Sequence, residues 1–120
     1  MSSRPTILIV DDDPNFREMY RTALQFCGFE VVTASDGLGA LLEIEQHAPS
    51  LVILDLNMPC IDGWEVLAEL AAHDATRAIP VIVVTGADVS KATLQAKAIL
   101  RKPILPEHVI PVIDRVLRAA

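Results

Sequence analysis

The sequence is poor in aromatic residues and has no excess of basic ones. Phe, Trp and Tyr make up 4% of its 120 residues, whereas apolar residues of all kinds make up 52%. This balance indicates a soluble globular chain with an aliphatic core and argues against disorder. Ten Lys and Arg against 16 Asp and Glu leave a formal net charge of −6. Without a basic stripe to neutralise phosphates, direct binding to nucleic acid is not expected.

Long hydrophobic runs and cysteine motifs are also missing. The apolar runs Ile7–Val10, Leu51–Leu54 and Val81–Val84 are far shorter than the about 20 residues of a membrane span. The first run leads directly into three aspartates, unlike the apolar region of a signal peptide. Cys27 and Cys60 show no metal-binding or redox spacing. These features favour the cytoplasm as the location and exclude a membrane partner.

Short apolar runs alternate with helical patterns along the chain. The runs that predict strands are Ile7–Val10, Val31–Ala34, Leu51–Leu54, Val81–Val84 and a weaker Ala98–Leu100. The first, third and fourth runs are apolar at all four positions, which is typical of strands buried on both faces of a parallel sheet. Strands that alternate with helices predict parallel pairing, right-handed crossovers and a three-layer α/β fold. We find no repeat or linker, so residues 1–120 are expected to form one domain.

Four apolar stripes at helical spacing predict the helices. Their members are Phe16, Tyr20, Ala23, Leu24 and Cys27; Leu38, Leu41 and Leu42; Gly63, Val66, Leu67, Leu70 and Ala71; and Val109, Val112, Ile113, Val116 and Leu117. A further helix between Asp88 and about Gln95 is expected to be only one or two turns long, because its residues form no clean stripe.

Polar side chains follow four of the predicted strands. Asp11 and Asp12 follow the first, Asp55 ends the third, Thr85 ends the fourth and Lys102 follows the fifth. In an open parallel sheet these carboxyl ends lie along one edge, where ligands bind. The sequence therefore predicts one site that contains three carboxylates, a hydroxyl and an ammonium group.

Carboxylates crowded in this way repel one another unless a cation joins them. Mg²⁺ prefers carboxylate oxygens and takes its remaining ligands from water and phosphate. A carboxylate can also be a nucleophile that forms an acyl phosphate, and phosphoryl transfer chiefly needs positioning and neutralised charge. Asp55 is the expected nucleophile because it ends a central strand.

These motifs resemble the receiver domain of two-component response regulators, including the chemotaxis-regulator type. The resemblance rests on Ile7-Leu8-Ile9-Val10-Asp11-Asp12-Asp13-Pro14, Asp36-Gly37, Leu54-Asp55-Leu56-Asn57-Met58-Pro59, Asp62-Gly63, Val84-Thr85-Gly86 and Lys102-Pro103. It covers nearly the whole chain. It implies a doubly wound, flavodoxin-like sheet of five parallel strands in the order 2-1-3-4-5, with helices on both faces.

The resemblance also assigns roles within the site. It implies that Asp55 is the phospho-acceptor and that Asp11, Asp12, Asp55 and the backbone carbonyl of Asn57 bind Mg²⁺. Thr85 and Lys102 would contact the phosphoryl group, and the Lys102–Pro103 peptide bond would be cis. The donor would be a sensor histidine kinase or a phosphotransfer protein, and the chain would catalyse only its own phosphorylation and dephosphorylation.

Three features depart from the family pattern. The segment between Thr85 and Lys102 is roughly five residues shorter than usual, which is more than one helical turn. Ile99 occupies a position where receivers usually carry Tyr or Phe, and we expect Ile99 to pack in the core. Pro111 falls inside the last predicted helix, where a proline costs about 3 kcal/mol. All three affect the face through which receivers usually signal and often dimerise. The sequence therefore leaves the downstream protein unidentified, and it allows either a monomer or a homodimer.

Simpler interpretations accompany these hypotheses. Asp13 is expected to be a helix N-cap, Trp64 a packing residue, and His47, His73 and His108 surface residues; Cys60 is expected in an exposed loop. A pseudo-receiver that binds partners without switching is the main alternative. A phosphatase of the haloacid-dehalogenase type is disfavoured, because Asn57 stands where that class needs a second acid.

Overall fold

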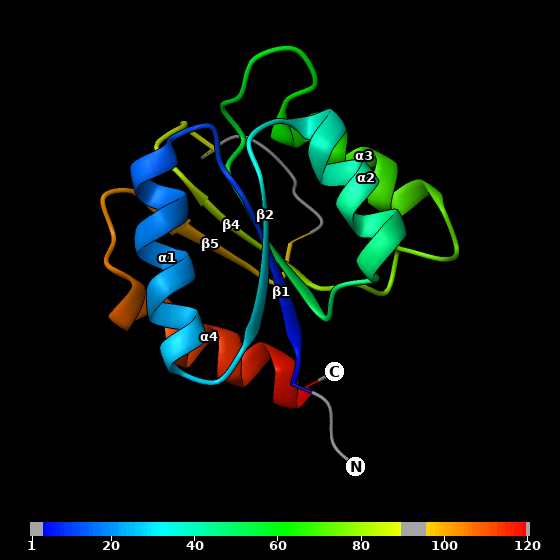
Figure 1. Cartoon of the computed structure of the whole chain (residues 1–120). Helices are drawn as coiled ribbons and strands as arrows, with labels where there is room; N and C mark the ends of the chain where they lie inside the picture. The colour runs from blue at the N-terminus through cyan, green and yellow to red at the C-terminus, as the bar shows by residue number, and fades with distance from the viewer. Residues whose placement is uncertain (1–3, 90–95, 120) are drawn as a thin grey trace.

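Over its described residues, the polypeptide folds into a five-stranded parallel sheet with two helices on each face (Figure 1). The computed structural model describes residues 4–89 and 96–119. In chain order the elements are β1 (Thr6–Val10), α1 (Pro14–Phe26), β2 (Glu30–Ala34), α2 (Gly37–His47), β3 (Leu51–Leu54), α3 (Gly63–Ala72), β4 (Val81–Thr85), β5 (Ala98–Arg101) and α4 (Pro106–Ala119). The strand order is β2-β1-β3-β4-β5, which confirms the predicted doubly wound topology.

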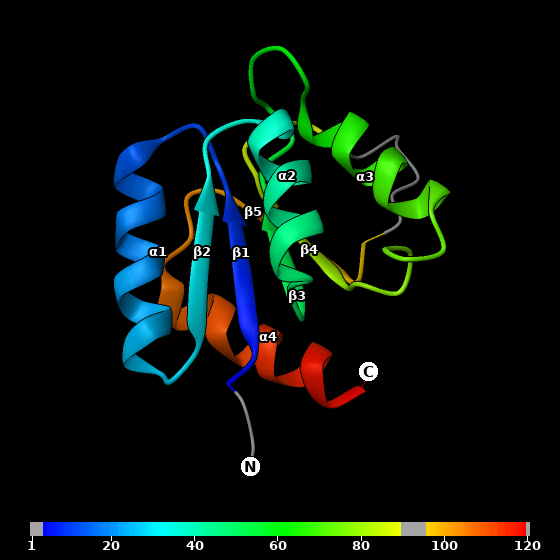
Figure 2. The same ribbon diagram turned by 45° about the vertical axis from the view of Figure 1, so that its right-hand side comes forward.

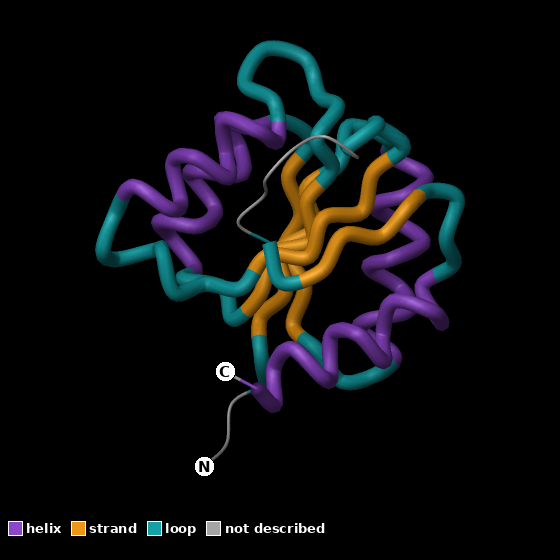
Figure 3. The backbone as a smooth tube through the Cα atoms, turned by 180° about the vertical axis from the view of Figure 1, so that it is seen from behind, coloured by secondary structure: helices purple, strands orange, loops and turns teal. Residues whose placement is uncertain are grey.

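Burial across the sheet follows the strand order. The central strands β1, β3 and β4 are buried at nearly every position, whereas the edge strands β2 and β5 are partly exposed. Alternate residues of the central strands face opposite sides, so the core has two halves. Helices α2 and α3 cover one half, and α1 and α4 cover the other (Figures 1 and 2). Viewed from behind, the helices flank the strands in the same two layers (Figure 3).

Aspartate side chains cap the N-termini of three helices. Asp13 accepts a hydrogen bond from the Asn15 backbone, directly before Pro14 in the first helical turn, as expected for an N-cap. Asp36 caps α2 in the same manner, and Asp62 forms a reciprocal capping box with Glu65 at α3. Each cap contributes about 1 kcal/mol. The caps fix where each helix begins beside the carboxyl edge of the sheet.

The buried stripe of α2 differs from the predicted one. Leu38 and Leu42 are 58% and 52% exposed, and the buried residues are Gly37, Ala40 and Ile44. The Gly37 backbone N–H donates to the carbonyl of Ile61, and a side chain at position 37 would collide with that carbonyl. This close approach sets the rotation of α2, so its small residues face the core and two leucines face outward.

Ile99 is also exposed, contrary to the expectation that it packs in the core. It is 45% exposed, because β5 is an edge strand whose side chains alternate between two faces. Ala98 and Leu100 point toward the α1–α4 half of the core, which leaves Ile99 on the opposite face.

Helix α4 continues through Pro111. A proline at this position leaves the carbonyl four residues earlier, on Glu107, without its helical donor. Both residues are exposed, so water can satisfy that carbonyl. The further helix expected between Asp88 and Gln95 falls on residues 90–95, outside the described part of the chain. Among the residues described, no helix combines the length and apolar character needed to cross a membrane.

Candidate phosphorylation site at the carboxyl edge of the sheet

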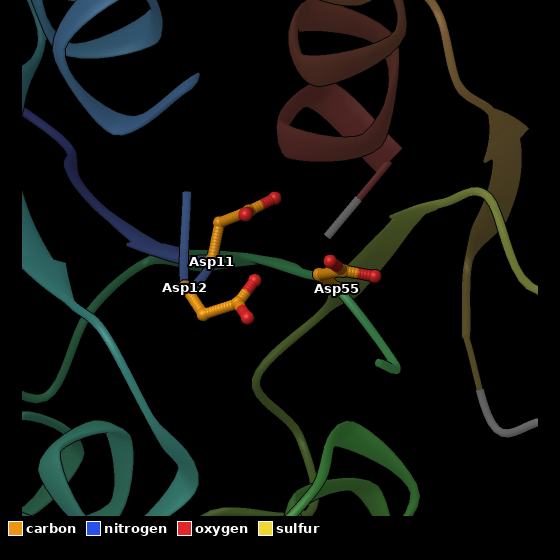
Figure 4. Close-up of side chains that lie close together, drawn as sticks. All are labelled: Asp11, Asp12 and Asp55. Carbon is orange, nitrogen blue, oxygen red and sulfur yellow. The ribbon is translucent and has the colours of Figure 1, made fainter. Parts of the chain in front are cut away.

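The strand register brings the predicted site residues together. Val10 of β1 lies opposite Leu54 of β3, so the residues that follow them, Asp11 and Asp55, are neighbours. Thr85 of β4 lies opposite Arg101 of β5, which places Lys102 directly after that pair. Figure 4 shows the side chains of Asp11, Asp12 and Asp55 grouped beside these strand ends.

Asp55 is buried and is held by donors on both oxygens. Its exposed fraction is 5%. The Thr85 hydroxyl donates to Oδ1 at 2.7 Å, and the Asn57 backbone N–H donates to the same oxygen at 3.2 Å. Lys102 Nζ donates to Oδ2 at 3.2 Å. The carboxylate is therefore oriented by groups from three separate segments of the chain.

Lys102 joins the two buried acids. Its Nζ lies 2.6 Å from Asp11 Oδ2, closer than to Asp55, and 4.5 Å from the centre of the Phe16 ring. The Lys102 backbone N–H donates to the carbonyl of Thr85, and the Lys102–Pro103 bond is cis, as predicted. The ammonium group is thus positioned by an acid pair and by the face of an aromatic ring.

Burial acts on the pKa values of Asp11 and Lys102 in opposite directions. Desolvation raises the pKa of Asp11 above its ordinary value, although Lys102 and the Asp13 backbone N–H act against it. For Lys102, burial lowers the pKa, but the hydrogen bond and charge of Asp11, together with the charge of Asp55, outweigh it and leave the pKa raised. Lys102 therefore stays cationic at neutral pH.

The charge balance of the site fits a divalent cation. Carboxylate oxygens of Asp11, Asp12 and Asp55 lie within 4.8 Å of one another. Asp12 is exposed, and no residue in the described ranges bonds to its side chain. When all three acids are ionised, Lys102 compensates only one of them. An ion of charge +2 with a preference for oxygen ligands suits this donor set.

The loop after Asp55 is tied to two helices. Gly63, the first residue of α3, donates its N–H to the Leu56 carbonyl, and any Cβ there would meet the carbonyl of Asp55. Gly37 holds the same loop through Ile61. Glycine at both positions lets the helices approach the loop closely.

All the predicted side chains, Asp11, Asp12, Asp55, Thr85 and Lys102, meet in this site, but two supporting residues were not predicted. Phe16 was assigned only to the core stripe of its helix, yet it is also the ring beneath Lys102. Arg17 donates through Nη1 to the carbonyl of Asp11 at 2.7 Å. Phe16 and Arg17 lie in the first turn of the helix that directly follows the aspartates, and this position in the sequence could have indicated that they lie beside the site. Among the simpler interpretations, Trp64 packs against the core, and Cys60 and the three histidines are exposed.

Comparison with known proteins agrees with this architecture. The family model described as "Response regulator receiver domain" matches residues 7–114. The chain belongs to this family, and it is a phosphorelay signalling module of the response-regulator type.

Two curated relatives match the sequence at moderate identity. The chain is 35% identical to the transcriptional regulatory protein PrrA of Mycobacterium tuberculosis over 95% of the chain and 50% of that protein. It is also 35% identical to the probable transcriptional regulator ycf27 of Pyropia yezoensis, over 99% of the chain and 50% of that protein. The chain thus spans about half the length of the curated relatives it matches.

Two solved structures align over almost their full length. The chemotaxis response regulator CheY4 of Vibrio cholerae superposes with a TM-score of 0.87 and 29% identity, covering 95% of this chain and 99% of that one. A CheY-like receiver domain protein of Methanospirillum hungatei gives a TM-score of 0.89 and 30% identity, over 98% and 96% of the two chains.

Proposed function

We propose that this receiver domain accepts a phosphoryl group on Asp55 in a Mg²⁺-dependent reaction and thereby switches its interactions with a downstream protein. The proposal rests on the environment of the Asp55 carboxylate. Its carboxylate is buried, oriented by Thr85 and Lys102, and adjacent to two further acids. A carboxylate held in this way suits nucleophilic attack on phosphorus.

The reaction balances as a simple transfer. One Asp55 carboxylate oxygen forms a bond to phosphorus while the bond from phosphorus to the donor nitrogen of a phosphohistidine breaks. The electron pair of that bond returns to the imidazole, which leaves without the phosphoryl group. Lys102 neutralises charge on the transferred group, and Thr85 donates a hydrogen bond to it.

Asp11, Asp12, Asp55 and the backbone carbonyl of Asn57 would hold the Mg²⁺ ion. Bound there, it would supply neutralising charge to the acids and to the phosphoryl oxygens. Asp12 would contribute through a carboxylate that no described residue engages. Lys102 would remain on the Asp11 and Asp55 side of the cluster.

Membership of the receiver family supports a proposal about the phosphoryl donor and the cellular location. Receiver domains interact with histidine kinases and phosphotransfer proteins, and we propose such a protein as the donor here. The chain would catalyse only its own phosphorylation and dephosphorylation. We assign residues 1–120 to one domain that acts in the cytoplasm, where the free and exposed thiols of Cys27 and Cys60 would stay reduced.

Labelling with acetyl phosphate tests the proposal. The protein is expected to gain one phosphoryl group in the presence of Mg²⁺ and none after chelation. Asp55→Asn should abolish labelling, and Asp74→Asn, which changes an exposed carboxylate away from the site, should not. Persistent labelling of Asp55→Asn would move the phosphorylation site elsewhere.

Trp64 offers a test against a receiver that does not switch. It is the single tryptophan and lies next to Gly63, whose backbone N–H donates to the carbonyl of Leu56, the residue after Asp55. Its fluorescence is expected to respond to Mg²⁺ and again to beryllofluoride, which mimics a phosphoryl group. The absence of both responses would favour the pseudo-receiver alternative.

A further inference from the structure

Helices α2 and α3 carry negative charge and contain no Lys or Arg. The sequence has no Lys or Arg between Arg21 and Arg77, a stretch that includes both helices. The acids on this face are Glu43 and Glu45 of α2, Glu65 and Glu69 of α3, and the caps Asp36 and Asp62. Among the described cations, Arg77 follows the hollow residue Thr76 directly, and its guanidinium pairs with Asp74 at 3.1 Å and not with a glutamate of α2 or α3.

A hollow of about 460 Å³ lies between the C-terminal halves of α2 and α3. Apolar side chains form much of its wall, including Leu41, Ile44, Leu70 and Ile79. Glu45, Glu69 and His73 also line it. Its volume falls within the roughly 300–1,000 Å³ of protein binding pockets, so it can accept several apolar side chains.

Exposed leucines extend this apolar surface along α2. Leu38, Leu41, Leu42 and Glu45 lie at i, i+3, i+4 and i+7, which places them on one side of the helix. Leu38 and Leu42 are more than half exposed, whereas Leu41 is partly buried at the hollow. The stripe therefore runs for two turns and ends at an acidic residue.

Two helix C-termini add to the negative potential. Ala48 and His73, the C-caps of α2 and α3, both line the hollow. A helix C-terminus carries a partial negative charge that basic side chains usually offset. The last turn of α3 contains no basic residue, and that of α2 contains only His47. Lys or Arg side chains of a partner protein would therefore interact favourably with the C-termini of α2 and α3.

We infer that this surface, defined by Leu38, Leu41, Leu42, the hollow and its acidic rim, binds a cationic amphipathic helix of a partner protein. Such a helix places apolar residues at i, i+3, i+4 and i+7 into a groove between helices. Its Lys and Arg residues would pair with Glu45, with the two helix ends and with Glu69, whose Oε1 lies 2.7 Å from His73 Nε2. A second copy of this chain fits poorly, since a two-fold contact would bring the same acids together. The inference does not depend on phosphorylation.

A fluorescent synthetic peptide tests the inference by anisotropy on the whole, Mg²⁺-free protein. The peptide consists of Leu, Ala and Lys, with Leu at i, i+3, i+4 and i+7. One control replaces each Lys by Glu, and the other scrambles the order of the same residues. Only the patterned Lys peptide is expected to bind, and hydrogen exchange should slow in α2 and the end of α3.

Matched variants locate the binding. Leu42→Ser and Glu45→Lys should each raise the Kd on the order of tenfold. Phe26→Ser removes a large apolar side chain that is 90% exposed on α1, and Glu18→Lys reverses an exposed charge on the same helix. Both should leave the Kd within about twofold, because they lie on the other side of the sheet.

Three results would overturn the inference. The scrambled peptide could bind as tightly as the patterned one, or Glu18→Lys could weaken binding as much as Glu45→Lys. Either result would mean that long-range charge attraction, and not this groove, accounts for the binding. Sedimentation that shows self-association abolished by Leu42→Ser would assign the surface to a second copy instead.

Discussion

The Thr85 hydroxyl donates to Asp55 Oδ1 at 2.7 Å, which links the end of β4 to the end of β3. Thr85 is 1% exposed, and its Oγ1 also accepts from the Ala87 backbone N–H. The hydroxyl thus connects the segment after β4 to the proposed phospho-acceptor. Any movement of Thr85 toward a phosphoryl group must break or redirect both hydrogen bonds.

Thr85→Ala is expected to destabilise the protein by about 1–2 kcal/mol, because it removes a hydrogen bond to a buried carboxylate that keeps other donors. Thr85→Ser retains the hydroxyl and should cost less than about 1 kcal/mol. Urea unfolding followed by Trp64 fluorescence measures both. Equal losses for the two variants would show that the Thr85 methyl group, and not its hydroxyl, matters.

Lys102→Met is expected to separate metal binding from phosphorylation. Removing the cation should strengthen Mg²⁺ binding on the order of tenfold, since a positive charge beside the acids opposes the ion. The same variant should lose acetyl phosphate labelling. Calorimetry with Mg²⁺ and mass measurement after labelling check the two effects. Weaker Mg²⁺ binding in this variant would contradict the assigned role of Lys102.

Asp12→Asn is expected to weaken Mg²⁺ binding at least about tenfold while leaving the metal-free protein at least as stable as before. The side chain is exposed and no described residue bonds to it, so its charge contributes repulsion but no contact. Asp13→Asn is the matched control, because Asn also serves as an N-cap. A clear loss of metal-free stability in Asp12→Asn, but not in Asp13→Asn, would indicate an unrecognised structural role.

Tyr20 is expected to make stability depend on alkaline pH. Its hydroxyl donates to the Ile104 carbonyl at 2.7 Å, and burial, helped by the charge of Asp11, raises the pKa of the phenol well above its usual range. Above a pH of about 10 the unfolded chain releases this proton while the folded protein retains it. The folded state then binds more protons, so the free energy of unfolding falls as pH rises.

Tyr20→Phe should reduce this alkaline loss and cost about 1 kcal/mol at neutral pH. Tyr20 is the single tyrosine, so ultraviolet absorbance of tyrosinate reports its ionisation directly. Titration of the folded protein at the usual tyrosine pKa would show that the phenol is accessible to water, contrary to its burial.

The sequence predicted the sheet and its polar edge well, because both depend on simple periodicity. Uninterrupted apolar runs identified β1, β3 and β4, and residues that follow parallel strands must meet at one edge. The side chains of Asp11, Asp55 and Lys102 therefore came together as expected.

The errors arose where tertiary contacts override local pattern. Leu38 and Leu42 suggested the buried stripe of α2, but the contact of Gly37 with Ile61 rotates the helix away from them. Ile99 looked like a core residue, yet exposure on an edge strand depends on what covers each face. The ring of Phe16 beneath Lys102 joins two distant segments, which no local pattern reveals.

The absence of Lys and Arg across β2, α2, β3 and α3 has a practical consequence for proteolysis. Trypsin cleaves after these residues, so complete digestion releases residues 22–77 as a single peptide. That peptide contains Asp55, Trp64 and both cysteines. Phosphorylation on Asp55 would therefore appear as a mass change in one large fragment, and a protease that cleaves beside acidic residues is needed to locate it more closely.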